Sequence, residues 1–179
     1  MIRAGSVGRK RTCEPEDWDE KGRTMISHIY VSFDSIIRSI QFGYTEINEG
    51  LTLSKQYGPS EGYSFRVVSF VSDEYVTGLS GSLGYHGGIA NLIFHTNRGK
   101  HGPFANDDNA PPPKIEIDPS IRDRREFGGF FGSYTFGGIT SIGIYVNPIP
   151  SSHGSGVDHF FDGFFDGDVY RKDRNLDTM

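Results

Sequence analysis

The stretch Ile36-Ile37-Arg38-Ser39-Ile40-Gln41-Phe42-Gly43-Tyr44 carries the pattern that decides the fold class. Its even positions are apolar apart from Arg38. Successive side chains of a strand point to opposite faces of a sheet, so an alternation of period two places one set of side chains in a core. The stretch therefore predicts a half-buried β-strand whose apolar face is interrupted only at Arg38.

The same alternation recurs on both sides of this stretch, in Ile29–Phe33 and in Ile142–Val146. Further predicted strands are Tyr63–Val71, Tyr75–Leu79, Ile89–Thr96, Lys114–Ile117 and Phe127–Phe136. Turn sequences rich in Gly, Pro and Asn separate them, and no window predicts a helix longer than about one turn. Strands at this spacing predict an all-β sandwich, barrel or prism.

The composition supports this fold class and removes several functions. The chain has 179 residues with 24 Gly, 9 Pro and 13% aromatic residues, which suits one domain of short strands and tight turns. Its net charge of −5 argues against nucleic acid or an anionic membrane as a partner, because both need a clustered basic surface. There is no apolar run of about 18 residues, so no membrane insertion is expected.

Cysteine and histidine usage argues against metal, cofactor and enzyme chemistry. Cys13 is the single cysteine, so neither an internal disulfide nor a thiolate metal site is expected. No HExxH pair, nucleophile elbow or phosphate loop occurs, so we expect no catalytic residues and no enzyme activity. The segment Met1–Arg11 lacks the apolar part of a secretory signal, and a cytoplasmic or nucleocytoplasmic location is expected.

The last part of the chain differs from the rest. After Pro148 and Pro150, it contains Phe160-Phe161-Asp162-Gly163 and the similar Phe164-Phe165-Asp166-Gly167. The sequence predicts one domain at residues 1–150 and a short, poorly ordered C-terminal extension at residues 151–179. Contiguous exposed aromatic residues mark interaction surfaces, so this extension is also a candidate protein-binding segment.

A set of motifs occurs in one order over residues 2–147. They are Trp18-Asp19-Glu20-Lys21-Gly22, Ile26–Val31, Ser39-Ile40-Gln41-Phe42-x-Tyr44, Thr77-Gly78-Leu79-Ser80-Gly81, Thr96-Asn97-Arg98-Gly99-Lys100-His101-Gly102-Pro103-Phe104, Phe130-Phe131-Gly132 and Ile142-Gly143-Ile144-Tyr145-Val146. In this combination the chain resembles a jacalin-related lectin domain of the plant type. The resemblance implies a β-prism of three four-stranded antiparallel sheets around one core.

The resemblance also implies a function. It points to a sugar site built without a metal ion from glycine-rich loops at one end of the prism. Glycans are the implied partners, of the mannose/glucose type in many members and of the galactose type in others. A role in plant defence or stress responses is implied in the same way, and homo-oligomerisation is left open.

In such a site, a Gly-x-x-x-Asp loop before the last strand and an N-terminal Gly-Gly segment hold the sugar. An ionised Asp accepts from two sugar hydroxyls at once, and Gly lets backbone N–H groups approach closely. Here Thr140 stands at the Asp position and Phe136 at the Gly position. The predicted carbohydrate-binding residues are Gly8, Tyr134, Phe136, Gly137, Gly138 and Thr140, with the two aromatic residues stacking on the sugar.

The departures from this pattern predict a degenerate and weak site. A hydrogen bond to a charged group contributes about 1.5–3 kcal/mol, and a millimolar complex has only about −4.1 kcal/mol in total. Each of these residues also has a purely structural interpretation. Thr140 can be a strand residue that hydrogen-bonds the loop backbone, the glycines can form ordinary turns, and the aromatic residues can pack at the edge of a sheet. The alternative function is a non-catalytic protein-interaction module on a β-prism that has lost sugar binding.

Overall fold

The computed structural model describes residues 1–10, 13–46, 48–59, 62–106 and 126–148, and these residues form strands and one short 3-10 turn. The elements, in chain order, are β1 (Ile2–Gly8), β2 (Glu16–Asp19), β3 (Ile26–Phe33), β4 (Ile37–Glu46), β5 (Gly50–Leu53), β6 (Ser64–Ser69), β7 (Val76–Leu83), η1 (Tyr85–Gly87), β8 (Ile89–Thr96), β9 (Gly99–Phe104), β10 (Phe127–Thr135) and β11 (Gly138–Val146).

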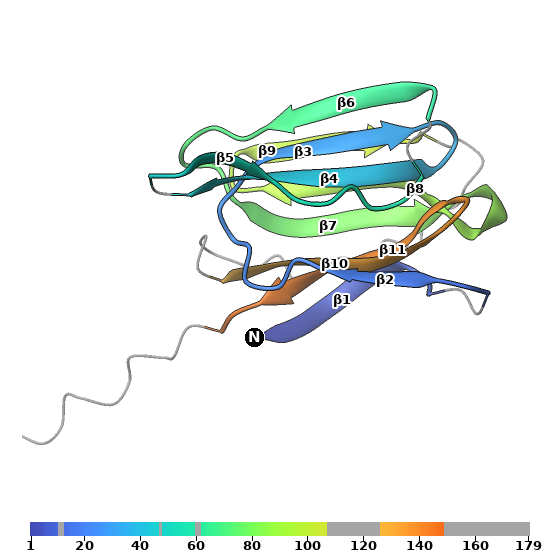
Figure 1. The fold of residues 1–179 in the computed structure, drawn as a ribbon, viewed down its shortest axis with the longest axis horizontal. Coiled ribbons are helices and arrows are strands. Elements are labelled where there is room, and N and C mark those ends of the chain that lie inside the picture. The colour runs from blue at the N-terminus through green and yellow to red at the C-terminus, as the bar shows by residue number, and fades with distance from the viewer. Residues whose placement is uncertain (11–12, 47, 60–61, 107–125, 149–179) are drawn as a thin grey trace, which may run out of the picture. The chain divides into compact units, whose positions relative to one another are not determined.

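The strands form three antiparallel sheets (Figure 1), which confirms the all-β prism, although the third sheet has three strands among the described residues where four were expected. The first sheet has the order β1-β11-β10-β2, the second β5-β4-β3-β6 and the third β7-β8-β9. The strand predicted at Lys114–Ile117 lies outside the described residues, as does the extension predicted at 151–179. Among the described residues, no helix is long and apolar enough to cross a membrane.

Three phenylalanines, one from each sheet, meet in the core. Phe42 lies on β4, Phe94 on β8 and Phe130 on β10, and none of the three exposes any surface. The ring centroids of Phe42 and Phe130 are 5.0 Å apart, and those of Phe94 and Phe130 are 5.8 Å apart. Each such aromatic pair adds about 0.5–1.5 kcal/mol to the stability gained from burial alone. The three sheets therefore share one core, with Phe130 in contact with both other rings.

The β4 strand departs from strict alternation at Arg38. Ser39 pairs with Ser32, but Ile37 pairs with Phe33, so Arg38 has no partner on β3 and forms a β-bulge. The bulge lets Ile37 be fully buried while Arg38 keeps contact with solvent. An arginine can interrupt the apolar face of this strand because its side chain stays partly exposed and bonds to Asp34 in the β3–β4 connection.

The structure contains strands that the sequence pattern does not reveal. The strands β3, β4, β6, β7, β8, β10 and β11 overlap the predicted ones, whereas Ile2–Gly8, Glu16–Asp19, Gly50–Leu53 and Gly99–Phe104 were not predicted as strands. All four are end members of the sheets formed by the described residues. Most of their side chains are exposed or half-buried, so they lack the apolar alternation that marks a strand.

Candidate functional site

Four strand connections meet at one end of the domain and surround a cavity of about 490 Å³. Figure 1 shows the β3–β4, β7–β8 and β10–β11 connections at this same end, and the β1–β2 connection adds Cys13. We call this cavity the loop pocket. It is lined by Cys13, Ser35, Ile36, Arg38, His86, Gly88, Thr135, Phe136, Gly137, Gly138 and Thr140.

The structure brings four of the six predicted sugar-binding residues into the loop pocket. Phe136, Gly137, Gly138 and Thr140 line it, and Phe136 at the tip of the β10–β11 hairpin is 97% exposed. An aromatic ring that is free of packing contacts at the rim of a pocket is available to stack on a ligand. These four residues therefore lie together along the wall of one cavity.

Gly8 and Tyr134 do not line the loop pocket. Gly8 has φ +83°, and a Cβ at this position would overlap the carbonyl oxygen of Thr140. It therefore allows β1 to lie close to β11, which is a structural role. The Tyr134 hydroxyl donates a hydrogen bond to the carboxylate of Glu16, on the side of the hairpin that faces β2. Within the described residues, neither group faces the cavity that holds the other four.

Thr140 is buried, and its hydroxyl is used inside the first sheet. It lies 2.9 Å from Oγ of Ser133 and donates to the backbone carbonyl of Ser133 at 3.2 Å. The backbone carbonyl of Thr140 accepts from the Arg9 N–H at 2.9 Å. With 2% of its surface exposed, Thr140 does not replace the carboxylate that the resemblance implies at this position.

Gly138 has a conformation that a larger residue would strain. Its φ is +138°, and a Cβ would lie 2.5 Å from the carbonyl oxygen of Ile37. Gly137 is different, since the nearest atom to a Cβ there would be Oγ1 of Thr135 at 3.6 Å. Gly138 therefore fixes the position of the β10–β11 hairpin against the second sheet, while Gly137 lies open toward the pocket.

Arg38 is a pocket residue that the sequence prediction of the site missed. Its Nε donates to Oδ2 of Asp34 at 2.7 Å, and its Nη1 donates to the carbonyl oxygen of Gly137 at 2.5 Å. The side chain thus joins the β3–β4 connection to the β10–β11 hairpin. The signal was present in the sequence, because Arg38 is the one charged residue on an otherwise apolar strand face.

Asp34 holds the Arg38 side chain in place through an ion pair. Partial burial alone would raise the pKa of Asp34, but the hydrogen bonds from Arg38 and from the Ile36 N–H outweigh it, and the net shift of the pKa is downward. Asp34 is therefore ionised at neutral pH and forms a fixed ion pair with Arg38. Its side chain is only 17% exposed.

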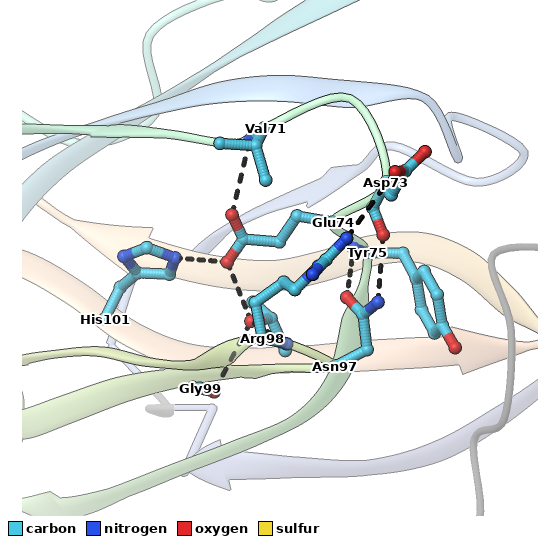
Figure 2. A network of polar contacts seen from close by, with 9 residues as sticks. Val71, Asp73, Glu74, Tyr75, Asn97, Arg98, Gly99 and His101 are labelled. Atoms are coloured by element: carbon cyan, nitrogen blue, oxygen red, sulfur yellow. Dashed lines mark hydrogen bonds and ion pairs between the residues drawn. The ribbon is translucent and has the colours of Figure 1, made fainter.

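A second polar cluster lies at the opposite ends of β7, β8 and β9 (Figure 2). The buried carboxylate of Glu74 accepts hydrogen bonds from Thr96 at 2.7 Å, His101 at 2.6 Å and the Val71 N–H at 3.2 Å. Burial alone would raise the pKa of Glu74, but these hydrogen bonds lower it overall. The cluster ties the β6–β7 connection to the β8–β9 turn, which is a structural role.

The residues that the structure describes include no group of three His, Cys, Asp or Glu side chains that could hold a metal ion. The polar groups of the loop pocket are instead suited to hydrogen bonding. Arg38 supplies N–H donors, and the turns at Gly88 and at Gly137–Gly138 bring backbone groups to the cavity wall. Such an arrangement can bind a small polar ligand with hydroxyl groups.

Comparisons with known proteins agree with this architecture. The family model for the Jacalin-like lectin domain matches residues 5–145. Jacalin-related lectin 24 of Arabidopsis thaliana is 49% identical over 156 residues, which cover 83% of this chain and 68% of that protein. Jacalin-related lectin 25 of the same plant is 44% identical over 83% of this chain and 60% of its own length. The chain thus spans only about two thirds of these relatives.

Solved structures show the same fold at low sequence identity. Malaysian banana lectin superposes with a TM-score of 0.63 at 24% identity, over 83% of this chain and 99% of that chain. AcmJRL, a mannose binding jacalin related lectin from Ananas comosus, superposes with a TM-score of 0.61 at 23% identity, over 83% and 98%. From the match over residues 5–145 and the identity to its relatives, the chain belongs to the jacalin-like lectin domain family.

Proposed function

We propose that this protein is a non-catalytic carbohydrate-binding lectin and that the loop pocket is its glycan site. The observation that carries this proposal is the meeting of four strand connections around one cavity of about 490 Å³ with an exposed aromatic residue, Phe136, at its rim. The volume falls in the range of about 300–1,000 Å³ that small-molecule sites occupy. Family membership supports glycans as the ligand class.

We further propose that the pocket binds mannose/glucose-type sugars weakly. The strand position that would supply a carboxylate holds Thr140, whose hydroxyl is bound to Ser133. Without that carboxylate, about two charge-assisted hydrogen bonds of 1.5–3 kcal/mol each are missing. The expected dissociation constant for a neutral monosaccharide is on the order of millimolar or weaker.

Calorimetry with methyl α-D-mannoside and methyl α-D-glucoside up to tens of millimolar tests the proposal. Cys13 offers an independent test of where the sugar binds, because it is the chain's single cysteine, is exposed and lines the loop pocket. A bound sugar should slow the alkylation of Cys13 by a fluorescent maleimide, and alkylation should weaken sugar binding. If no glycan binds at these concentrations and no sugar protects Cys13, the lectin proposal is wrong.

The biological setting is proposed on family membership alone. We propose a role in plant defence or stress responses and a cytoplasmic or nucleocytoplasmic location. A fluorescent fusion of the full chain, imaged in plant cells, tests the location. Accumulation of the fusion in the secretory pathway would contradict it.

A second candidate function is favoured by the outer face of the second sheet. Large apolar side chains are exposed there on both end strands, namely Leu51 and Leu53 on β5, Phe65 and Val67 on β6 and Tyr63 just before β6. Tyr63 is 97% and Phe65 62% exposed, so these two residues alone present about 300 Å² of aromatic surface. Patches of a few hundred Å² mark interaction sites.

The partner that fits this face is a second copy of the chain. β6 is an end strand of its sheet, and two identical end strands can pair antiparallel about a two-fold axis. Light scattering after size-exclusion chromatography should then show a dimer that Phe65→Ser dissociates, while Leu83→Ser on the third sheet leaves it intact. A monomer at high micromolar concentration would exclude this function.

A further inference from the structure

The loop pocket presents the guanidinium group of Arg38, which is paired with Asp34 outside the lining, where the family pattern implies a carboxylate. Among the described residues that line it there is no Asp or Glu, and Arg38 is the one side chain with a permanent charge. Glu14 and Glu16 line a neighbouring groove that shares Phe136 and Thr135 with the pocket, and they do not line the pocket itself. A ligand in the loop pocket therefore faces a guanidinium group.

The guanidinium group of Arg38 is held in place and keeps further N–H groups that can donate to a ligand. The bonds to Asp34 and to the Gly137 carbonyl use two of the five N–H groups that an arginine carries. The side chain is 30% exposed, and it lines the pocket. Because its two anchors come from different strand connections, the remaining N–H groups are held in a defined place before a ligand arrives.

Asp34 does not replace the missing sugar-binding carboxylate. Besides Arg38, it accepts hydrogen bonds from the Ile36 N–H at 3.2 Å and from the Ser35 hydroxyl at 3.4 Å. It does not line the loop pocket. The pocket thus offers donors from Arg38 but no carboxylate acceptor from the described residues.

From this arrangement we infer that the loop pocket selects acidic sugars, specifically hexuronates of the glucose type, over the corresponding neutral hexoses. The inference rests on the proposed lectin function and names the ligand class of the same site. A hexuronate keeps the ring hydroxyls of the hexose and carries a planar carboxylate at C6. Arginine binds a planar carboxylate through paired N–H groups more strongly than it binds a neutral hydroxyl.

Calorimetry with methyl α-D-glucuronide and methyl α-D-glucoside tests the inference, because the two ligands differ only at C6. The wild-type chain should bind the glucuronide about tenfold more tightly, the factor that one charge-assisted hydrogen bond supplies. Raising the salt concentration from about 0.02 to 0.5 M should weaken glucuronide binding and leave glucoside binding unchanged, since screening acts on the charged ligand.

Two variants assign the preference to Arg38. Arg38→Gln should bring the two affinities within about twofold of each other, and Arg38→Lys, which keeps the positive charge, should retain part of the preference. Thermal unfolding of both variants shows whether the fold is kept. If Arg38→Gln disturbs the hairpin and lowers both affinities, Arg38→Lys and the salt dependence of the wild type decide the matter.

The outcomes separate this inference from the proposed function. Wild-type binding of the glucoside with no preference for the glucuronide, or a preference that Arg38→Gln leaves unchanged, overturns the inference alone. Binding of neither sugar at tens of millimolar overturns the lectin proposal as well. A tighter, salt-sensitive glucuronide complex that depends on Arg38 supports both.

Discussion

Replacing Glu74 with glutamine should destabilise the domain at neutral pH and should do so less and less as the pH falls. The Glu74 carboxylate is nearly buried; its Oε1 accepts hydrogen bonds from Thr96 and His101, and its Oε2 accepts one from the Val71 N–H. A glutamine has almost the same shape but supplies one oxygen and an NH₂ group. One side of the cluster in Figure 2 then faces a donor in place of an acceptor.

The magnitude follows from the kind of hydrogen bond that is lost. Bonds to a charged acceptor contribute about 1.5–3 kcal/mol each and neutral bonds about 1 kcal/mol, so the change costs about 2–3 kcal/mol of unfolding free energy. For a domain of this size, each kcal/mol lowers Tm by about 2–4 °C. Glu74→Gln should therefore lower Tm by about 4–12 °C at pH 7.

The pH dependence has a definite sign. In the folded protein the pKa of Glu74 lies below its ordinary value of 4.5, because the hydrogen bonds from His101, Thr96 and Val71 outweigh the opposing effect of burial. A carboxyl with a lowered pKa contributes stability that is present above its unfolded pKa and is lost as the pH falls through its folded pKa. The difference in Tm between wild type and Glu74→Gln should thus begin to shrink as the pH falls below the ordinary value of 4.5.

Differential scanning calorimetry at pH 7, 5, 4 and 3.5 measures this gap. The control is Glu49→Gln, since Glu49 is exposed on the β4–β5 turn and its replacement should shift Tm by less than about 1–2 °C. A gap that keeps its full size at pH 3.5, or equal Tm values of both variants at pH 7, would refute the role of the Glu74 charge.

Four further substitutions test the fold and the pocket. Gly138→Ala should cost about 1–3 kcal/mol, because a Cβ would lie 2.5 Å from the Ile37 carbonyl oxygen at φ +138°, while Gly137→Ala should be near neutral; equal Tm values for the two would contradict this account. Thr140→Val should cost about 1 kcal/mol in urea unfolding yet change sugar affinity less than twofold, and a large loss of affinity would make Thr140 a ligand contact. Phe130→Ala should cost about 3–5 kcal/mol by urea unfolding, and a cost below about 1 kcal/mol would exclude its central place in the core.

The fold could be predicted where side chains are buried on one face of a strand. The alternation in Ile36–Tyr44 reflects burial of Ile40, Phe42 and Tyr44, and β4 lies in the interior of its sheet. Short end strands such as Gly50–Leu53 bury too little apolar surface to impose an alternation. Their pairing is decided by the neighbouring strand, which a local pattern does not contain.

The site was predicted in part for a related reason. The resemblance gave the β10–β11 hairpin, and Phe136, Gly137 and Gly138 do line the loop pocket. Arg38 was missed because its place depends on a β-bulge and on contact with a hairpin 99 positions away in sequence. Gly8 shows a different difficulty, because a glycine that allows two strands to approach cannot be distinguished by sequence from one that lets a sugar approach.

The central claim is that the loop pocket is the glycan site, and backbone amide chemical shifts test it most directly. In a ¹⁵N-labelled sample titrated with methyl α-D-glucoside and then methyl α-D-glucuronide, the account predicts saturable shift changes at Gly88, Phe136, Gly137 and Gly138, which line the pocket. The changes should reach saturation at lower concentration of the glucuronide. Shift changes centred on Phe65 and the outer face of the second sheet, or none at tens of millimolar sugar, would contradict the claim.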